Sequence, residues 1–93
     1  MNEITEEKLR KYFRITEEAL KKARSAEKDR HMLSHAEDFL DMAQRYFDDA
    51  RHFEKKGDIV TAFACLNYAH GWLDAGARIG LFKVKDSRLF TVD

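Results

Sequence analysis

Apolar residues recur every three or four positions along most of this chain, the spacing that places them on one face of a helix. The first segment with this spacing runs from about residue 4 to about residue 26, and the second from about residue 34 to about residue 56. The third, from about residue 59 to about residue 80, carries no formal charge over 15 consecutive residues, Ile59 to Leu73. The pattern therefore predicts three helices, of which the third is the most apolar.

Local turn chemistry defines one helix boundary and leaves another open. Gly57 can adopt the left-handed conformation that ends a helix, and Asp58 can cap the free amides that open the next one. We therefore expect a tight antiparallel hairpin at this point. The segment between the first two helices contains no glycine or proline. Ser34 followed by Glu37 fits a capping box for the second helix, and Asp29 is the alternative cap.

Composition favours one helical domain spanning residues 1–93. Hydrophobic residues make up 44% and charged residues 37% of the chain, and proline is absent, which is typical of an ordered, mainly helical protein. We expect an all-α fold, an antiparallel three-helix bundle in which the first two helices grip the third. Residues 81–93 are predicted to form a short extended tail. It is either a strap that covers the open end of the bundle with Phe82, Leu89 and Phe90 or a segment that pairs with a partner or with a second copy of the chain.

The charge distribution narrows the classes of partner. Seventeen basic and 17 acidic residues give a formal net charge of zero, without the basic field that attracts nucleic acid or anionic lipid. No run reaches the roughly 18 apolar residues that would span a bilayer, and the first residues lack the features of a secretory signal. A single cysteine, Cys65, cannot form an internal disulfide. We expect a cytoplasmic protein with neither membrane nor nucleic acid as its partner.

A polar stripe interrupts the apolar third helix. Asn67, His70, Asp74 and Arg78 are spaced three, four and four residues apart, so they project from one face. One interpretation is a binding site in which His70 titrates or donates, Asp74 orients it and Arg78 holds an anion. The other is a hydrogen-bond network that fixes how the helix docks, which is the commoner use of buried polar residues.

Tyr68 and Trp72 lie four residues apart beside this stripe. An aromatic pair at helical spacing belongs to the core in most proteins. Trp72 follows Gly71, however, and this arrangement is also suited to lining a shallow groove.

Metal binding and catalysis receive little support from the sequence. His31, His35 and Asp38 have a spacing that can hold zinc on a helix, but no fourth ligand can be named. We therefore predict no metal and no cofactor. Arg45 and His52 match the loose spacing of a class of helical ribonucleases, which leaves a nuclease-like enzyme as an alternative.

The third helix also carries a resemblance to a known family. The run from Gly57 to Phe82, with its core Tyr-Ala-His-Gly-Trp-Leu-Asp-Ala-Gly at residues 68–76, resembles the signature of a short archaeal family known only as a domain of unknown function. Met42-Ala43, Tyr46 and Asp49-Ala50 look like the preceding helix of that family. The resemblance implies an archaeal source and a closed, left-handed three-helix bundle. It implies no activity.

These observations together favour a non-enzymatic binding or adaptor module. We expect a protein partner or self-association, and the alternatives are the nuclease-like enzyme and a structural subunit of a homo-oligomer. The candidate binding residues all lie on the third helix: Asn67, Tyr68, His70, Trp72, Asp74 and Arg78.

Overall fold

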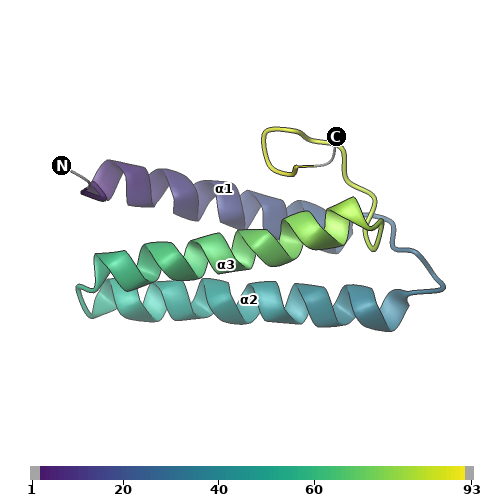
Figure 1. The fold of residues 1–93 in the computed structure, drawn as a ribbon, viewed down its shortest axis with the longest axis horizontal. Helices are drawn as coiled ribbons and strands as arrows, with labels where there is room; N and C mark the ends of the chain where they lie inside the picture. The colour runs from purple at the N-terminus through teal and green to yellow at the C-terminus, as the bar shows by residue number, and fades with distance from the viewer. Residues whose placement is uncertain (1–2, 92–93) are drawn as a thin grey trace.

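Three helices form the described part of the chain, residues 3–91, in the computed structural model (Figure 1). They are α1 (Glu6–Ser25), α2 (Leu33–Lys55) and α3 (Ile59–Arg78). The chain runs up, down and up, so α1 and α3 point the same way and α2 runs against them. The predicted all-α three-helix bundle is confirmed.

The start of α2 differs from the prediction. The helix begins at Leu33 after Met32, which makes no side-chain capping bond, and Ser34 already lies inside the first turn. The capping box is therefore absent. Asp29, the alternative cap, accepts from the backbone N–H of His31 at 2.9 Å in a turn before the helix. Side-chain caps are present at the other two starts, where Thr5 accepts from the N–H of Lys8 and Asp58 accepts from the N–H of Thr61, each at 3.1 Å.

Both α2 and α3 end in the same hydrogen-bonded motif. After α2, the N–H of Gly57 donates to Glu54 O at 2.9 Å and the N–H of Asp58 donates to Phe53 O at 2.9 Å. Gly57 has a φ of 80°, a left-handed conformation that glycine adopts without steric cost. Gly80 and Leu81 close α3 in the same way. These caps explain why each helix stops where it does.

A single apolar core joins the three helices and the segment after them. Its largest fully buried side chains include Phe82, Leu9, Leu66, Leu73 and Leu81. Alanines Ala62 and Ala69 of α3 are completely buried, which allows the neighbouring helices to approach closely. The apolar third helix is not enclosed on every side, however, because its outward face remains exposed to solvent.

Residues 81–91, called the strap below, fold back against α1 and α3 (Figure 1). Phe82, Leu89 and Phe90 are buried, as the sequence predicts for a cover over the open end of the bundle, and Leu81 is buried as well. One backbone bridge pairs Phe82 with Lys28 in the α1–α2 connection. Residues 92 and 93 of the predicted tail lie outside the described part of the chain.

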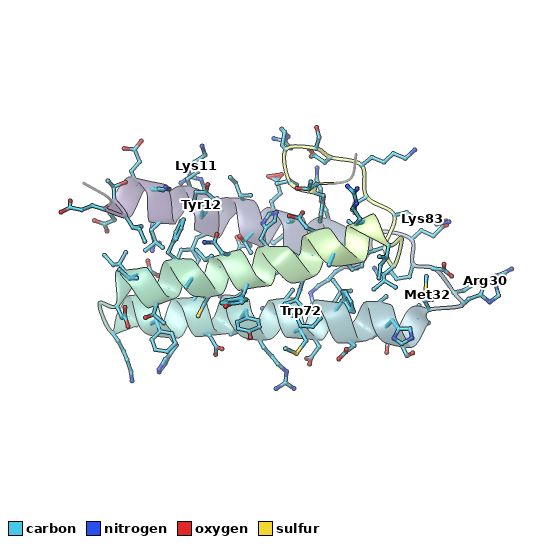
Figure 2. All side chains as sticks on the ribbon, viewed as in Figure 1. Lys11, Tyr12, Arg30, Met32, Trp72 and Lys83 are labelled. Atoms are coloured by element: carbon cyan, nitrogen blue, oxygen red, sulfur yellow. The ribbon has the colours of Figure 1, made fainter. Side chains whose placement is uncertain are left out.

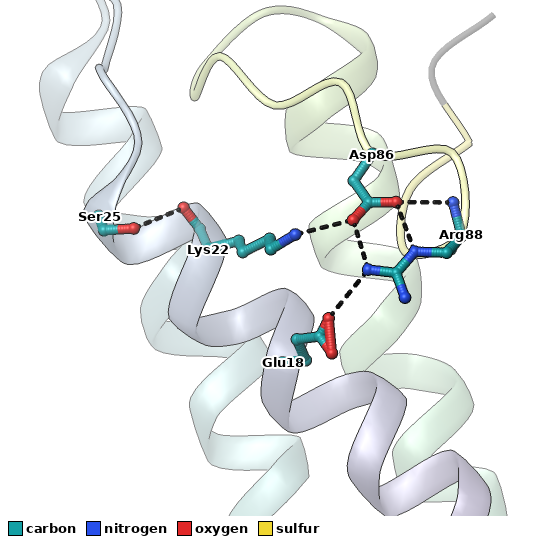
Figure 3. A network of polar contacts seen from close by, with 5 residues as sticks. All are labelled: Glu18, Lys22, Ser25, Asp86 and Arg88. Carbon is teal, nitrogen blue, oxygen red and sulfur yellow. Dashed lines mark hydrogen bonds and ion pairs between the residues drawn. The ribbon is translucent and has the colours of Figure 1, made fainter.

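A charged network anchors the strap to α1 (Figure 3). Asp86 accepts from Lys22 Nζ at 2.7 Å and from Arg88 at 2.8 Å, and Arg88 also reaches Glu18 at 3.3 Å. The bonds from Arg88 and Lys22 lower the pKa of the Asp86 carboxyl well below its usual range. Because these groups are exposed to solvent, the network orients the strap more than it stabilises the fold.

Candidate functional site

An aromatic groove lies on the surface where α3 packs against α2. It has a volume of about 410 Å³. Its walls are mostly apolar and come from one residue of α2 and five residues of α3: Phe39, Asn67, Tyr68, Gly71, Trp72 and Ala75. An apolar concavity with few polar groups in its walls is the ordinary starting point for a binding-site hypothesis.

Two ring contacts between α2 and α3 position the groove. Phe39 meets Trp72 edge-on, with centroids 5.0 Å apart and planes at 90°. Tyr46 stacks on Tyr68 at 5.3 Å and 22°. Figure 2 labels Trp72, whose half-buried side chain lies along the α2 side of α3. Such contacts stabilise the arrangement by about 0.5–1.5 kcal/mol each beyond their buried area, so the walls of the groove are held in place.

The exposure of Tyr68 corrects the prediction that this aromatic pair belongs to the core. The Tyr68 side chain is 64% exposed, although its stacking partner Tyr46 is half-buried. Trp72 is half-buried and lines the groove. Trp72 also packs against the core. The core interpretation is therefore wrong for Tyr68 and holds in part for Trp72, and both residues line the shallow groove of the alternative interpretation.

The groove continues into a solvent-facing stripe along α3, here called the outward face. Among the described residues, only four large hydrophobic side chains are exposed, and three of them belong to α3 and its C-cap: Val60 at 69%, Tyr68 at 64% and the cap residue Ile79 at 57%. Exposed small residues fill the positions between them at helical spacing. The uncharged residues of the outward face, apart from Asn67, are Val60, Ala64, Tyr68, Gly71, Ala75 and Ile79, and Asn67 and Arg78 are the other exposed residues of α3.

Gly71 and Gly76 of α3 differ in the space available for a side chain. A Cβ on Gly76 would overlap the ring of Phe82, so the fold itself requires glycine there. A Cβ on Gly71 would meet no atom of another part of the structure within 4 Å. Glycine within a helix costs roughly 0.5–1 kcal/mol relative to alanine. Packing within one chain therefore gives no reason for glycine at position 71.

The polar stripe is divided between the strap and the surface. His70 Nε2 donates to the backbone carbonyl of Leu89 and lies 3.8 Å from Asp74 Oδ1. Asp74 accepts from the backbone N–H of Thr91 at 2.9 Å. His70 and Asp74 are thus used to hold the strap on α3, which agrees with the structural interpretation of these two residues.

Asn67 and Arg78 have a different environment from the other two residues of the stripe. Both are exposed. Asn67 borders the aromatic groove and also a smaller polar pocket on the other side of Gly71, where His70 and Asp74 contribute. Arg78 is the last residue of α3, and it interacts with another group of the protein. The six candidate residues therefore do not converge on one site, because the two on the strap side are occupied by backbone groups.

The other candidate residues do not assemble into a site. His31 lies in the turn before α2, so the helical spacing assumed for His31, His35 and Asp38 does not exist. Within residues 3–91, no group of three His, Cys, Asp or Glu side chains is placed to hold a metal ion. Arg45 pairs with Asp41 at 2.8 Å, one turn earlier on α2.

Cys65 is buried on the side of α3 away from solvent. Burial raises the pKa of its thiol, and the nearby carboxylates of Asp49 and Asp58 raise it further. A thiol with a raised pKa is a weak nucleophile at neutral pH, so Cys65 serves as a core residue.

Sequence reasoning missed Phe39 and Tyr46 as parts of the site, together with the outward positions of α3. Both aromatics follow the three-to-four-residue spacing of apolar positions along α2. Only the packing of α2 on α3 brings them to the edge of an exposed groove. The sequence also did not indicate that uncharged residues of α3 are exposed, because an uncharged segment predicts burial.

Comparison with known proteins places the chain in a family. Residues 11–82, more than half of the chain, match the family described as a protein of unknown function (DUF357). The chain belongs to this family. The DUF357 match includes all of α2 and α3 and ends at Phe82, the strap residue that fills the space beside Gly76.

No curated protein and no solved structure matches the chain significantly. Among the described residues of this DUF357 protein, no helix is long and apolar enough to cross a membrane.

Proposed function

We propose that this DUF357 protein is a protein-interaction module that binds an apolar helix of a partner in the aromatic groove. The observation that carries the proposal is the location of Val60, Tyr68 and Ile79, three of the four exposed large hydrophobics of the described chain, along α3 and its C-cap. Exposed apolar surface that is contiguous and rimmed by polar residues marks binding sites in soluble proteins.

The shape and chemistry of the groove favour a helix as the bound element. The outward face follows helical spacing along α3, so a second helix can lie beside it with its own apolar face inserted. Tyr68 and Trp72 supply large, rigid contact area, and Asn67 offers one amide for orientation. The groove contains no ionised side chain that would recognise a phosphate or a charged small molecule.

A catalytic role has less support. His70 is engaged by the carbonyl of Leu89, and the Cys65 thiol is buried. The nuclease-like alternative depends on Arg45 and His52, which lie on the exposed surface of α2, with Arg45 paired to Asp41. The resemblance of residues 57–82 to an archaeal signature and the free cysteine support an archaeal, cytoplasmic setting as part of the proposal.

Site-specific photo-crosslinking in cells tests this function. A photoreactive aromatic amino acid at position 68 is expected to give a covalent protein–protein product, because that position faces the bound partner. The same amino acid at Lys21, which is exposed on α1, is the control. Adding Ala75→Glu, which places a charge on the outward face without disfavouring helix, is expected to abolish the product. Equal products from positions 68 and 21, or a product that survives Ala75→Glu, would contradict the proposal.

A further inference from the structure

We infer that the partner helix at the aromatic groove is α3 of a second copy of this chain, bound antiparallel across a two-fold axis. This inference rests on the proposed function and names the occupant of the same site. It follows from the order of residues along the outward face, from the uncharged run of residues 59 to 73 and from the unexplained glycine at position 71.

The outward face is self-complementary when it is read in opposite directions. An antiparallel pairing centred between Ala69 and His70 places Val60 of one chain opposite Ile79 of the other. The same register places Ala64 opposite Ala75, and Tyr68 opposite Gly71. A two-fold interface requires one patch to match itself in this way, with residue i facing j and j facing i.

The residues that face each other in this register also match in size. The largest outward side chain, Tyr68, faces the smallest residue, Gly71, on the partner helix. The empty space around Gly71 opens to the aromatic groove on one side and to the polar pocket on the other. A tyrosine from the second copy fits this place. Alanines at positions 64 and 75 allow two backbones to approach to the short end of the usual interhelical distance, about 8 Å.

Gly71 provides an independent reason for close approach. Packing within one chain does not require glycine here, in contrast to Gly76, which makes room for the Phe82 ring. A helical glycine that weakens its own helix is explained when another backbone or a large side chain lies against it. The second copy of Tyr68 supplies that neighbour.

Charge favours a second copy over a charged partner. Residues 59 to 73 carry no formal charge, so an acidic or basic segment finds no complement on this part of the face, and the exposed Arg78 lies beyond it at the end of α3. The chain has a formal net charge of zero, and two copies therefore approach without net repulsion.

The size of the face indicates how tightly two copies associate. A 20-residue helix is about 30 Å long and about 10 Å wide, so the outward face of α3 buries on the order of 600 Å² in a pair. Phe39 and Tyr46 of α2 enlarge the contact toward the roughly 1,200 Å² at which specific interfaces begin. This area predicts a concentration-dependent dimer rather than a permanent one.

Sedimentation equilibrium of the purified chain tests the inference. Between about 1 µM and about 1 mM, the range that resolves weak association, the average mass is expected to rise from one chain to two. Ala64→Glu and Ala75→Lys should each weaken dimerisation at least tenfold. Their equimolar mixture should restore it, because the two new charges face each other in the antiparallel register.

Two controls test whether the antiparallel register is the correct one. A mixture of Ala64→Glu and Ala64→Lys should not restore association, because these positions lie about 16 Å apart along the antiparallel pair. Ser34→Glu, at an exposed position at the start of α2, should leave dimerisation unchanged. Restoration by the same-position mixture would overturn the antiparallel arrangement, and association unaffected by Ala64→Glu and Ala75→Lys would overturn the site.

The failure of this inference is distinguishable from the failure of the proposed function. A purified chain that stays monomeric throughout, together with a position-68 crosslink whose mass is not that of two chains, would overturn self-association and leave the interaction module standing. A crosslinked product with the mass of two chains, lost in Ala75→Glu, supports both.

Discussion

Replacing Gly71 with alanine should stabilise the isolated chain, and this prediction follows directly from the structure. Gly71 lies in the middle of α3 and is exposed, and a Cβ at this position would meet no atom of another part of the molecule within 4 Å. The change therefore introduces no internal clash. It removes the conformational freedom that glycine gives the unfolded chain, a gain of about 0.5–1 kcal/mol.

Thermal unfolding monitored by circular dichroism measures this gain in protein dilute enough to be monomeric. One kcal/mol shifts the melting temperature of a domain of this size by about 4–8 °C, so Gly71→Ala should raise it by about 2–8 °C. Gly76→Ala is the matched control, on the same helix. There the new methyl overlaps the Phe82 ring, and overpacking of about 1–3 kcal/mol should lower the melting temperature.

The same Gly71→Ala variant should dimerise less well than the wild type, because the new methyl occupies space that Tyr68 of the second copy fills. A more stable monomer with weaker self-association is the expected combination. A lower melting temperature for dilute Gly71→Ala would refute the reasoning, since it would show that glycine at this position serves the fold of one chain.

Three further predictions concern the fold and the strap. Thr16 is fully buried and its hydroxyl has no hydrogen-bond partner, so Thr16→Val should raise the free energy of unfolding by about 1 kcal/mol in denaturant titrations. Asp58→Ala, which removes the cap of α3, should lower it by about 1 kcal/mol in the same assay. The pKa of Asp86 is lowered by Arg88 and Lys22, so its contribution is present above the unfolded value of about 3.9 and is lost as pH falls through the folded value. Melting temperatures between about pH 5 and about pH 2 should therefore fall more steeply for wild type than for Asp86→Asn, and equal slopes would show that the network contributes nothing.

Local features of the sequence predicted most of the fold. Helical spacing of apolar residues identified all three helices, and the Gly57–Asp58 turn was readable because it depends on two adjacent residues. The start of α2 was not predicted correctly. Ser34 and Glu37 match the pattern of a capping box, but the helix begins at Leu33, one residue before the expected cap. A sequence pattern shows that a residue able to cap a helix is present, but whether this residue caps the helix depends on tertiary packing.

The candidate site was predictable only in part, because it depends on contacts between distant residues. The sequence identified Tyr68, Trp72 and Asn67, but Phe39 joins them only through the packing of α2 on α3. His70 and Asp74 share one helix face with Asn67, yet the strap, about 17 to 19 residues further along the chain, occupies them. Uncharged residues on α3 predicted burial, and the structure exposes a row of them.

The amide spectrum of the purified wild-type chain, compared between dilute and concentrated solution, tests most directly that the outward face of α3 is a contact surface. We expect chemical-shift changes that grow with concentration and are confined to that face and the groove rim, strongest around Tyr68 and Gly71. Spectra that do not change with concentration, or changes centred on the far side of the bundle where α1 meets α2, would contradict it.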